Sequence, residues 1–324
     1  MTAKDLKNAL LQEAVQGRLV PQIASEGNAR DLLEEIRKEK LSHGLDFANA
    51  KSGKRKSKKE TALAGSNPCD ITEEEIPFDI PESWCWCRLG EICNEIKRGK
   101  SPKYADKSNF LAFAQKCNVK TGGIDLGLAL YLDENSITRY SETDNLVQGD
   151  IVINSTGGGT MGRVGLYETQ VPAGIKGVYP DSHVTVIRSI GNINQHYLYY
   201  VLKLNQPVLE KCGTGSTNQT ELKPAVLADF VIPLPPLAEQ KRIVAAIEKF
   251  MPLIEEYGKK ATELKAINEK IGTLTKKAIL QEAVQGKLVP QIASEGNARD
   301  LLEEIRKERL SHGLDFANAK SGKR

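Results

Sequence analysis

Residues 149–168 carry the glycine pattern that most directly suggests chemistry. The stretch reads GDIVINSTGGGTMGRVGLYE, and Gly157, Gly159 and Gly162 have the G-x-G-x-x-G spacing of a dinucleotide-binding loop. In such a loop the third glycine opens a helix whose N-terminus faces the pyrophosphate. Here RVGLYE follows, in which apolar residues alternate as in a strand, and the Gly-Lys-Ser/Thr of a P-loop is missing. We therefore predict a β-hairpin whose glycine tip lets the backbone come close to a ligand.

The other reactive residue types form no recognisable catalytic or metal-binding set. The six cysteines lack C-x-x-C spacing, and with four scattered histidines they predict no zinc site. We interpret them as reduced thiols of a cytoplasmic protein. Since no convincing Ser/His/Asp or Cys/His arrangement appears either, the sequence predicts no intrinsic catalysis and no bound cofactor.

Composition and charge are those of an ordinary globular protein. The chain has 324 residues, 40% of them hydrophobic and 27% charged, with a net charge of +3. Because the net charge is small, a nucleic-acid surface would have to be a local basic patch. No apolar run reaches the length of a membrane helix, and the N-terminus has no signal-peptide core, so we expect no membrane partner.

A near-identical repeat decides the organisation of the chain. Residues 9–55 return as residues 278–324, and only three of the 47 positions differ, namely Leu10/Ile279, Arg18/Lys287 and Lys40/Arg309. Each copy predicts two helices, the first ended by a glycine and a proline and the second capped by an asparagine, Asn28 in the first copy. The chain thus holds one full unit and the start of another.

The fold class that these patterns predict is α+β, with one globular domain followed by a long coiled-coil helix and short helical segments at both ends. The central residues contain short β-like runs such as DIVIN, HVTVIRS and DFVIPL, and most of the glycine. We expect Trp84, Trp86 and Leu89 to build the core rather than stack on bases. The predicted parts are an N-terminal helical segment with a basic linker (1–76), a globular domain (77–235), a long helix (236–289) and the second copy of the N-terminal segment (290–324).

The long helix begins near Pro236 and could extend from about 237 to 285, roughly 70 Å at 1.5 Å per residue. Its apolar residues alternate in steps of four and three, which is a heptad seam. The seam residues that we predict for a dimer interface are Ile243, Ile247, Phe250, Ile254, Tyr257, Leu264, Ile271 and Leu274. Packing against the chain's own domain is the alternative to a coiled coil with a second helix.

Four segments, in this order, resemble the specificity subunit of Type I restriction-modification systems. EIPFDIPESWCWCRLGEIC (75–93) is similar to the start of a target-recognition domain, and the glycine stretch to its hairpin. GSTNQTELKPAVLADFVIPLPPLAEQKRIVAAIE is similar to the exit into the spacer helix, and AILQEAVQGKLVPQ with ARDLLEEIRKE to the segment between two recognition domains. The resemblance covers nearly the whole chain, but members commonly carry two recognition domains and two spacer helices, whereas this chain has one of each.

The resemblance implies a non-catalytic protein that reads double-stranded DNA and positions methylation and restriction subunits. S-adenosylmethionine would belong to the methylation subunit. The sequence agrees, because the string nearest to an adenine-methyltransferase motif, Asn67-Pro68-Cys69-Asp70, lacks the second proline and the stacking aromatic. Since one spacer helix is missing, the resemblance implies an antiparallel homodimer, each copy reading one half-site of a bipartite target.

Three loops of the central domain are the candidates for contacting DNA. Basic side chains neutralise phosphates, Arg can read guanine, and Asn and Gln can pair with adenine. The candidates in the basic stretch 97–107 are Lys97, Arg98, Lys100, Lys103 and Tyr104. Those in the glycine loop are Ser155, Thr156, Thr160 and Arg163, and those in the polar stretch 213–223 are Thr214, Ser216, Thr217, Asn218 and Gln219. Each loop could instead be a solvated turn, and the basic stretch 51–59 a solvated linker or a phosphate-contacting arm.

Two further functions compete with DNA recognition. A coiled-coil scaffold would assemble proteins without reading DNA, and the absence of salt-dependent duplex binding would favour it. A nucleotide-dependent enzyme is suggested only by the glycine spacing, and the strand that we predict after the glycines argues against it.

Overall fold

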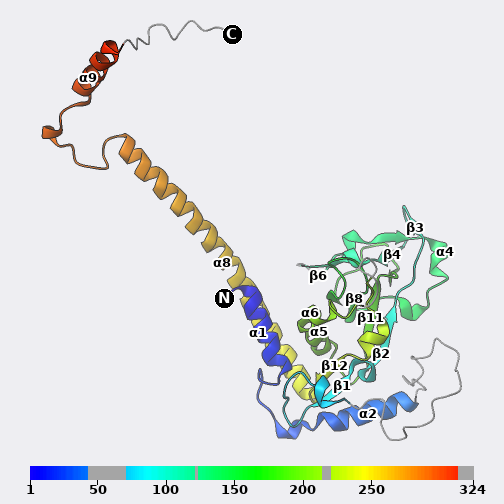
Figure 1. Cartoon of the computed structure of the whole chain (residues 1–324). Helices are drawn as coiled ribbons and strands as arrows, with labels where there is room; N and C mark the ends of the chain where they lie inside the picture. The colour runs from blue at the N-terminus through cyan, green and yellow to red at the C-terminus, as the bar shows by residue number, and fades with distance from the viewer. Residues whose placement is uncertain (43–70, 121–122, 214–219, 313–324) are drawn as a thin grey trace. The chain divides into compact units, whose positions relative to one another are not determined.

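The computed structural model describes residues 1–42, 71–120, 123–213 and 220–312, and Figure 1 shows how their elements follow one another. The fold is α+β, as predicted: a sheet-rich domain is followed by one long helix, α8 (Leu237–Val284). The chain divides into two compact units, Met1–Tyr257 and Gly258–Arg324. The four functional parts inferred from the sequence remain a prediction. The basic stretch 51–59 lies outside the described residues.

The first unit contains all the strands of the described residues. Helices α1 (Ala3–Val15) and α2 (Ala29–Ser42) precede them, with the 3₁₀ turn η1 (Ala24–Glu26) between. The strands are β1 (Cys85–Arg88), β2 (Cys93–Arg98), β3 (Tyr104–Ala105), β4 (Phe110–Phe113), β5 (Asn118–Val119), β6 (Gly123–Ile124), β7 (Leu130–Leu132), β8 (Asp150–Asn154), β9 (Val164–Tyr167), β10 (Gly177–Pro180), β11 (Val184–Ser189) and β12 (Val231–Leu234). The shorter helices are α3 (Leu89–Ile92), α4 (Glu134–Ile137), α5 (Gln195–Leu204), α6 (Gln206–Leu209) and α7 (Pro224–Ala228), and the second unit adds η7 (Ala293–Glu295) and α9 (Ala298–Ser311).

Two four-stranded sheets form the centre of the first unit. One is antiparallel throughout, in the order β2-β11-β8-β9, and the other has the order β10-β4-β7-β3 with β10 and β4 parallel. The short strands β1 and β12 pair antiparallel, with Cys85 opposite Leu234. Because β1 begins the domain and β12 ends it, this pairing brings the first strand of the domain beside the residues from which α8 starts.

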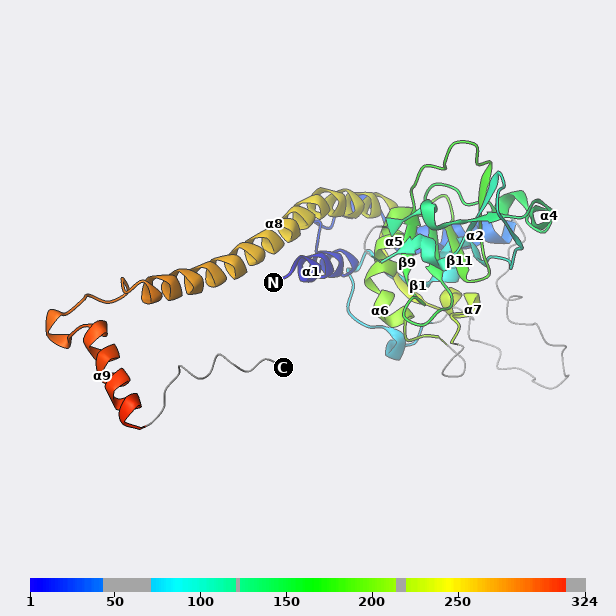
Figure 2. The same cartoon turned by 90° about the horizontal axis from the view of Figure 1, so that it is seen from above.

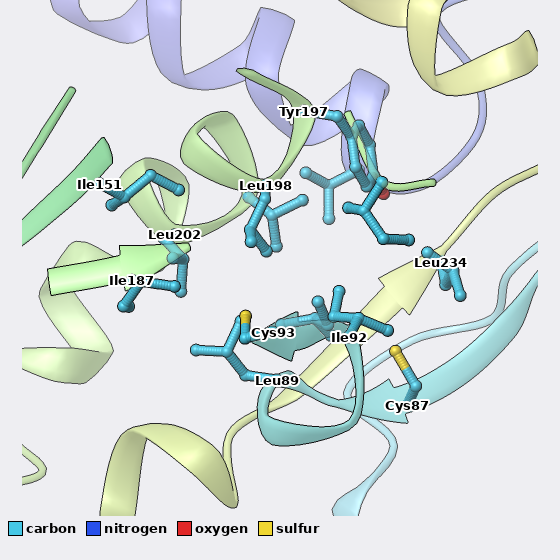
Figure 3. Packing of buried hydrophobic residues seen from close by; sticks show 14 of the residues in the cluster. Cys87, Leu89, Ile92, Cys93, Ile151, Ile187, Tyr197, Leu198, Leu202 and Leu234 are labelled. Atoms are coloured by element: carbon cyan, nitrogen blue, oxygen red, sulfur yellow. The ribbon is translucent and has the colours of Figure 1, made fainter. Parts of the chain in front are cut away.

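The main core lies between helix α5 and the strands below it (Figure 3). Ile151 of β8 and Ile187 of β11 lie near Leu198 and Leu202 of α5, while Cys87 and Leu234 come from β1 and β12. Trp84 and Leu89 are buried, as predicted. Trp86 does not join this core, contrary to the prediction, because it is only partly buried and packs edge-on against Phe78. Burial raises the pKa of Cys93 to about 12, and the described residues contain five cysteines, all of them free thiols.

The two N-terminal helices belong to this same core. Leu11, Ala14 and Val15 of α1 and Leu33 and Ile36 of α2 are buried in it. Helix α1 lies antiparallel to the start of α8, because Gln22 after α1 contacts Glu239 while the Tyr257 hydroxyl donates to the carbonyl of Met1. Figures 1 and 2 both show α1 beside the first turns of α8. The prediction of two helices in the first copy is confirmed, and the Asn28 side chain accepts from the first turn of α2.

The beginning of α8 corrects part of the predicted dimer seam. Ile243 and Ile247 are fully buried in the core of their own unit, beside α1. They share the heptad spacing of the later residues, but here the partner of the apolar face is the chain's own N-terminal segment. We therefore remove these two positions from the dimer surface.

The glycine stretch forms the predicted hairpin. Strands β8 and β9 pair antiparallel with Ile153 opposite Val164, so a strand and not a helix follows the glycines. Gly159 has a φ of +76° with no atom near its missing side chain, whereas Gly162, at +78°, would place a Cβ 2.6 Å from the backbone nitrogen of Glu210. Gly162 is thus required both for its left-handed backbone and for the close approach to α6.

Three alanine substitutions separate these effects on the free energy of unfolding. Gly158→Ala should be neutral or slightly stabilising, because its φ is ordinary and its surroundings are open. Gly159→Ala should cost about 1–2 kcal/mol for the positive φ alone. Gly162→Ala should cost more than about 3 kcal/mol, since the clash adds to the strain. Urea unfolding measures all three, and equal costs for Gly159→Ala and Gly162→Ala would contradict the close approach.

Candidate nucleic-acid interface

The tip of the β8–β9 hairpin lies against the turn between β10 and β11. The Thr156 hydroxyl and His183 Nδ1 are hydrogen-bonded at 2.6 Å, and Ser155 N donates to the carbonyl of His183. Asp181, which is buried, holds this turn by accepting from His183 N at 2.8 Å, and burial raises the pKa of Asp181. Gly158 and Gly159 are exposed at the tip. The hairpin therefore presents bare backbone next to an exposed imidazole.

Arg98 at the end of β2 reaches the same turn. Its Nε donates to the carbonyl of Ser182, and its guanidinium is ion-paired with Glu221. Leu222 N donates to the carbonyl of Ser155 at 2.8 Å. We call Arg98, Thr156, Gly158, Gly159 and His183 the hairpin cluster. It brings together side chains from two of the three predicted loops, and Glu221, near the end of the third stretch, contacts it.

The remaining predicted residues of the glycine loop are held by the protein itself. Ser155 is fully buried and hydrogen-bonds to the Thr185 hydroxyl at 2.6 Å, so it is not available to a ligand. Thr160 Oγ1 donates to Gln115 Oε1 at 3.2 Å. Arg163 Nη1 donates to the carbonyl of Asn118 at 2.7 Å, which fastens the hairpin to β5. Of the four predicted residues, Thr156 is therefore the one placed at the tip.

The basic stretch 97–107 is less free in the structure than its sequence indicates. Lys97 and Lys100 both contact the buried carboxylate of Asp144, Lys100 at 2.7 Å. Burial would raise the pKa of Asp144, but the hydrogen bonds from Lys100 and Lys97 lower it well below its usual range. Hydrogen bonding to Asp144 raises the pKa of Lys97. Two of the predicted phosphate-binding lysines are thus already engaged in ion pairs within the chain.

Lys103 and Tyr104 lie elsewhere, at the outer strand of the other sheet. Tyr104 begins β3, the edge strand beside β7, and is 49% exposed. Among the described residues, no ion pair engages the exposed Lys103 side chain, whose backbone N–H and carbonyl bond to Ser136 and Asp133. We call Lys103 and Tyr104 the edge pair. The predicted residues Thr214, Ser216, Thr217, Asn218 and Gln219 lie outside the described residues.

Reasoning from sequence missed His183 and the residues that support it. No motif distinguishes it from the other histidines, because its role depends on the β10–β11 turn meeting the hairpin. The Thr156–His183 pair resembles a nucleophile and its base, but Asp181 bonds the backbone of His183 and does not orient its ring. The cluster offers a guanidinium, an imidazole and backbone amides, which are groups that bind phosphates and groove edges.

Neither a metal cluster nor a membrane-spanning helix occurs in the part of the chain that the structure describes. No group of three or more His, Cys, Asp or Glu side chains there is arranged to hold a metal ion. No helix there is both long and apolar enough to cross a membrane.

The later seam residues of α8 are more exposed to solvent than the first two, Ile243 and Ile247. Ile254 is half-buried, whereas Phe250, Tyr257, Leu264, Ile271 and Leu274 are exposed, Leu264 by 59%. Leu264, Ile271 and Leu274 are the most exposed of them, and all six remain candidates for contact with another chain.

Residues 81–266 match the family described as the Type I restriction modification DNA specificity domain. The specificity subunits of the Type I restriction enzymes EcoAI and EcoEI of Escherichia coli are 28% and 26% identical to this chain, over 94% and 95% of it. The chain spans 55% of the length of each. The crystal structure of the HsdS subunit from Thermoanaerobacter tengcongensis aligns with a TM-score of 0.45 and 23% identity, covering 65% of this chain and 47% of that one.

The family match covers more than half of the chain and includes the hairpin cluster, the edge pair and the first half of α8. This chain belongs to the Type I restriction-modification specificity subunit family.

Proposed function

We propose that this chain is the DNA-recognition subunit of a Type I restriction-modification complex and binds one half-site of a bipartite target. Residues 77–235 would form the target-recognition domain and α8 the spacer. The observation that carries the proposal is the hairpin cluster, where a glycine tip, Arg98 and His183 meet on the surface of the family's DNA specificity domain. Catalysis and S-adenosylmethionine would belong to the methylation subunit, and cleavage to the restriction subunit.

The hairpin cluster suits groove or phosphate contact better than catalysis. Arg98 is paired with Glu221, and both side chains are partly exposed, so that solvent weakens the ion pair and the arginine can exchange it for another partner. A DNA phosphate could therefore replace the carboxylate. Thr156 and His183 would then present a hydroxyl and a ring nitrogen beside backbone that has no side chains to obstruct a close approach.

The edge pair offers a second, separate contact. Lys103 would neutralise a phosphate, and Tyr104 would pack on a sugar. Lys97 and Lys100 we now assign to the ion-pair network around Asp144, which supports β2 rather than DNA.

Dimerisation would supply the second half-site. We propose that Phe250, Ile254, Tyr257, Leu264, Ile271 and Leu274 pack against the same face of a second α8 in an antiparallel coiled coil. The apolar face of the helix beyond Tyr257 supports this proposal, because a helix does not leave such a stripe in water without a partner.

Two substitutions should change DNA affinity in opposite directions. Lys103→Gln removes a phosphate contact, so Kd for duplex DNA should rise several-fold and the slope of log K against log salt should fall by about 1. Glu221→Gln frees Arg98 and removes a repelling charge, so binding should tighten and the slope should steepen by about 1. Fluorescence anisotropy over a salt series measures both.

Lys97→Gln is the matched control, because it removes the same charge from a lysine that is already paired with Asp144. It should leave the salt slope unchanged. If all three variants and the unaltered chain show the same weak, salt-independent binding, the chain is instead a scaffold that does not read DNA.

A single charge in the seam should separate the dimer. Leu264→Asp would bury an unpaired carboxylate in the proposed interface, so the mass measured by light scattering should fall from two chains to one. Thr273→Asp lies on the opposite face of the helix, nine residues away, and should leave the dimer intact. A monomeric unaltered chain, or equal effects of both changes, would contradict the proposed interface.

A further inference from the structure

The second copy of the repeat folds like the first copy but lacks its packing. Helices α2 and α9 occupy equivalent residues, Ala29–Ser42 and Ala298–Ser311, and each follows an equivalent 3₁₀ turn. Gln22 and Gln291 make the same hydrogen bond, to the carbonyls of Gly17 and Gly286. Yet Leu33 and Ile36 are buried, whereas their counterparts Leu302 and Ile305 are 52% and 40% exposed.

The first copy shows which surface such a segment covers. Helix α2 packs on β1 and α3, so that Leu33 and Ile36 share one core with Cys87, Leu89 and Ile92. We call the surface formed by Trp84, Cys87, Leu89, Gly90, Glu91, Ile92, Glu239 and Arg242 the docking surface.

Polar contacts fix the first copy on the docking surface at two places, just before α2 and near the end of α2. In the segment just before α2, Gln22 donates to Glu239 at 2.5 Å, and Glu26 pairs with Arg242 at 2.6 Å. The N–H of Ala29 donates to the carbonyl of Ser83.

Further along α2, two cations reach the short helix α3. Arg37 pairs with Glu91 at 2.6 Å, and Lys40 Nζ donates to the carbonyl of Gly90 at 2.6 Å. These contacts set the register of the segment along the surface.

The second copy retains this set of side chains. The counterparts of Gln22, Glu26, Ala29 and Arg37 are Gln291, Glu295, Ala298 and Arg306. The one difference at a contact is Lys40, replaced by Arg309, which is also a cation that can donate to a carbonyl. All described residues from 259 onward are exposed. A 14-residue helix is marginal in water without packing, so α9 needs a surface of this kind.

We propose that the C-terminal copy, residues 280–311, is a second segment for the docking surface, and that it binds this surface on another copy of the chain. There it takes the place of that chain's N-terminal copy. The 48 residues of α8 separate the docking surface from the C-terminal copy along the chain, so we assign the contact to a second chain. The inference goes beyond DNA recognition and does not depend on it.

Competition between the two copies follows from their near identity. The N-terminal copy is joined to its own docking surface, which gives it a high effective concentration. The C-terminal copy of another chain has only its concentration in solution. Exchange should therefore become evident once the N-terminal copy is weakened.

The experiment measures the melting temperature of full-length variants at several protein concentrations, and every variant also carries Leu264→Asp, so that the proposed α8 interface adds no concentration dependence of its own. Ile36→Asp releases the N-terminal copy, so docking must come from another chain. Its Tm should then rise with concentration, by about 5–10 °C between about 1 µM and about 100 µM. Adding Ile305→Asp should remove this rise and lower the Tm further, whereas Ile305→Asp alone should leave the Tm unchanged.

Matched controls and an added peptide complete the test. Leu41→Asp and Leu310→Asp carry the same change at the exposed faces of α2 and α9 and should have no effect. A synthetic peptide of residues 278–312 should raise the Tm of the Ile36→Asp/Ile305→Asp protein, and the same peptide carrying Ile305→Asp should not.

The proposal is overturned if Ile36→Asp has the same Tm as the double variant at every concentration, or if the peptide has no effect. No DNA is present in these measurements, so their failure would leave the proposed DNA recognition untouched.

Discussion

The buried carboxylate of Glu239 joins three parts of the chain that are far apart in sequence. It accepts from Trp84 Nε1 at 2.9 Å and from Gln22 Nε2 at 2.5 Å, so the N-terminal segment, the residue that precedes β1 and the start of α8 meet at one residue. Burial raises the pKa of Glu239, and these two hydrogen bonds oppose the rise. Together with the β1–β12 pairing, this junction fixes where the helix leaves the domain. Every proposal that uses α8 as a spacer depends on that junction.

Ion pairing inside the domain decides which basic residues remain for a ligand. Asp144 pairs with both Lys97 and Lys100, Lys97 also reaches Glu95, and Arg188 is held by Asp150 and Glu95. These charges stabilise the packing of β2, β8 and β11, because they are paired in partly buried positions. Among the predicted DNA-contacting residues that the structure describes, this leaves Arg98, Lys103, Tyr104 and Thr156, to which the structure adds the His183 imidazole and the bare backbone of the glycine tip. This selection agrees with the small net charge of the chain, which predicted a local patch rather than a basic face.

The local sequence pattern was sufficient to predict the helices and strands, but not which residues pack against or pair with them. The strand after the glycines and the span of α8 follow from alternation and heptad spacing, and the structure confirms both. Spacing could not distinguish Ile247, buried against α1, from Leu264, exposed later in the same seam, because the difference lies in what covers each turn. Likewise Lys97 and Lys103 look equivalent in sequence, but Asp144, 47 residues from Lys97, reaches only the first of them. His183 was missed for the same reason.

The most direct test of the central claim is to map methylated adenines in a host that expresses this chain with its methylation subunit. Two identical copies, each reading one half-site, predict methylation at a symmetric, interrupted palindrome. An asymmetric bipartite site would contradict the account, because it requires a second, different recognition domain. Absence of methylation, with the methylation subunit shown to bind, would contradict the claim that this chain reads DNA.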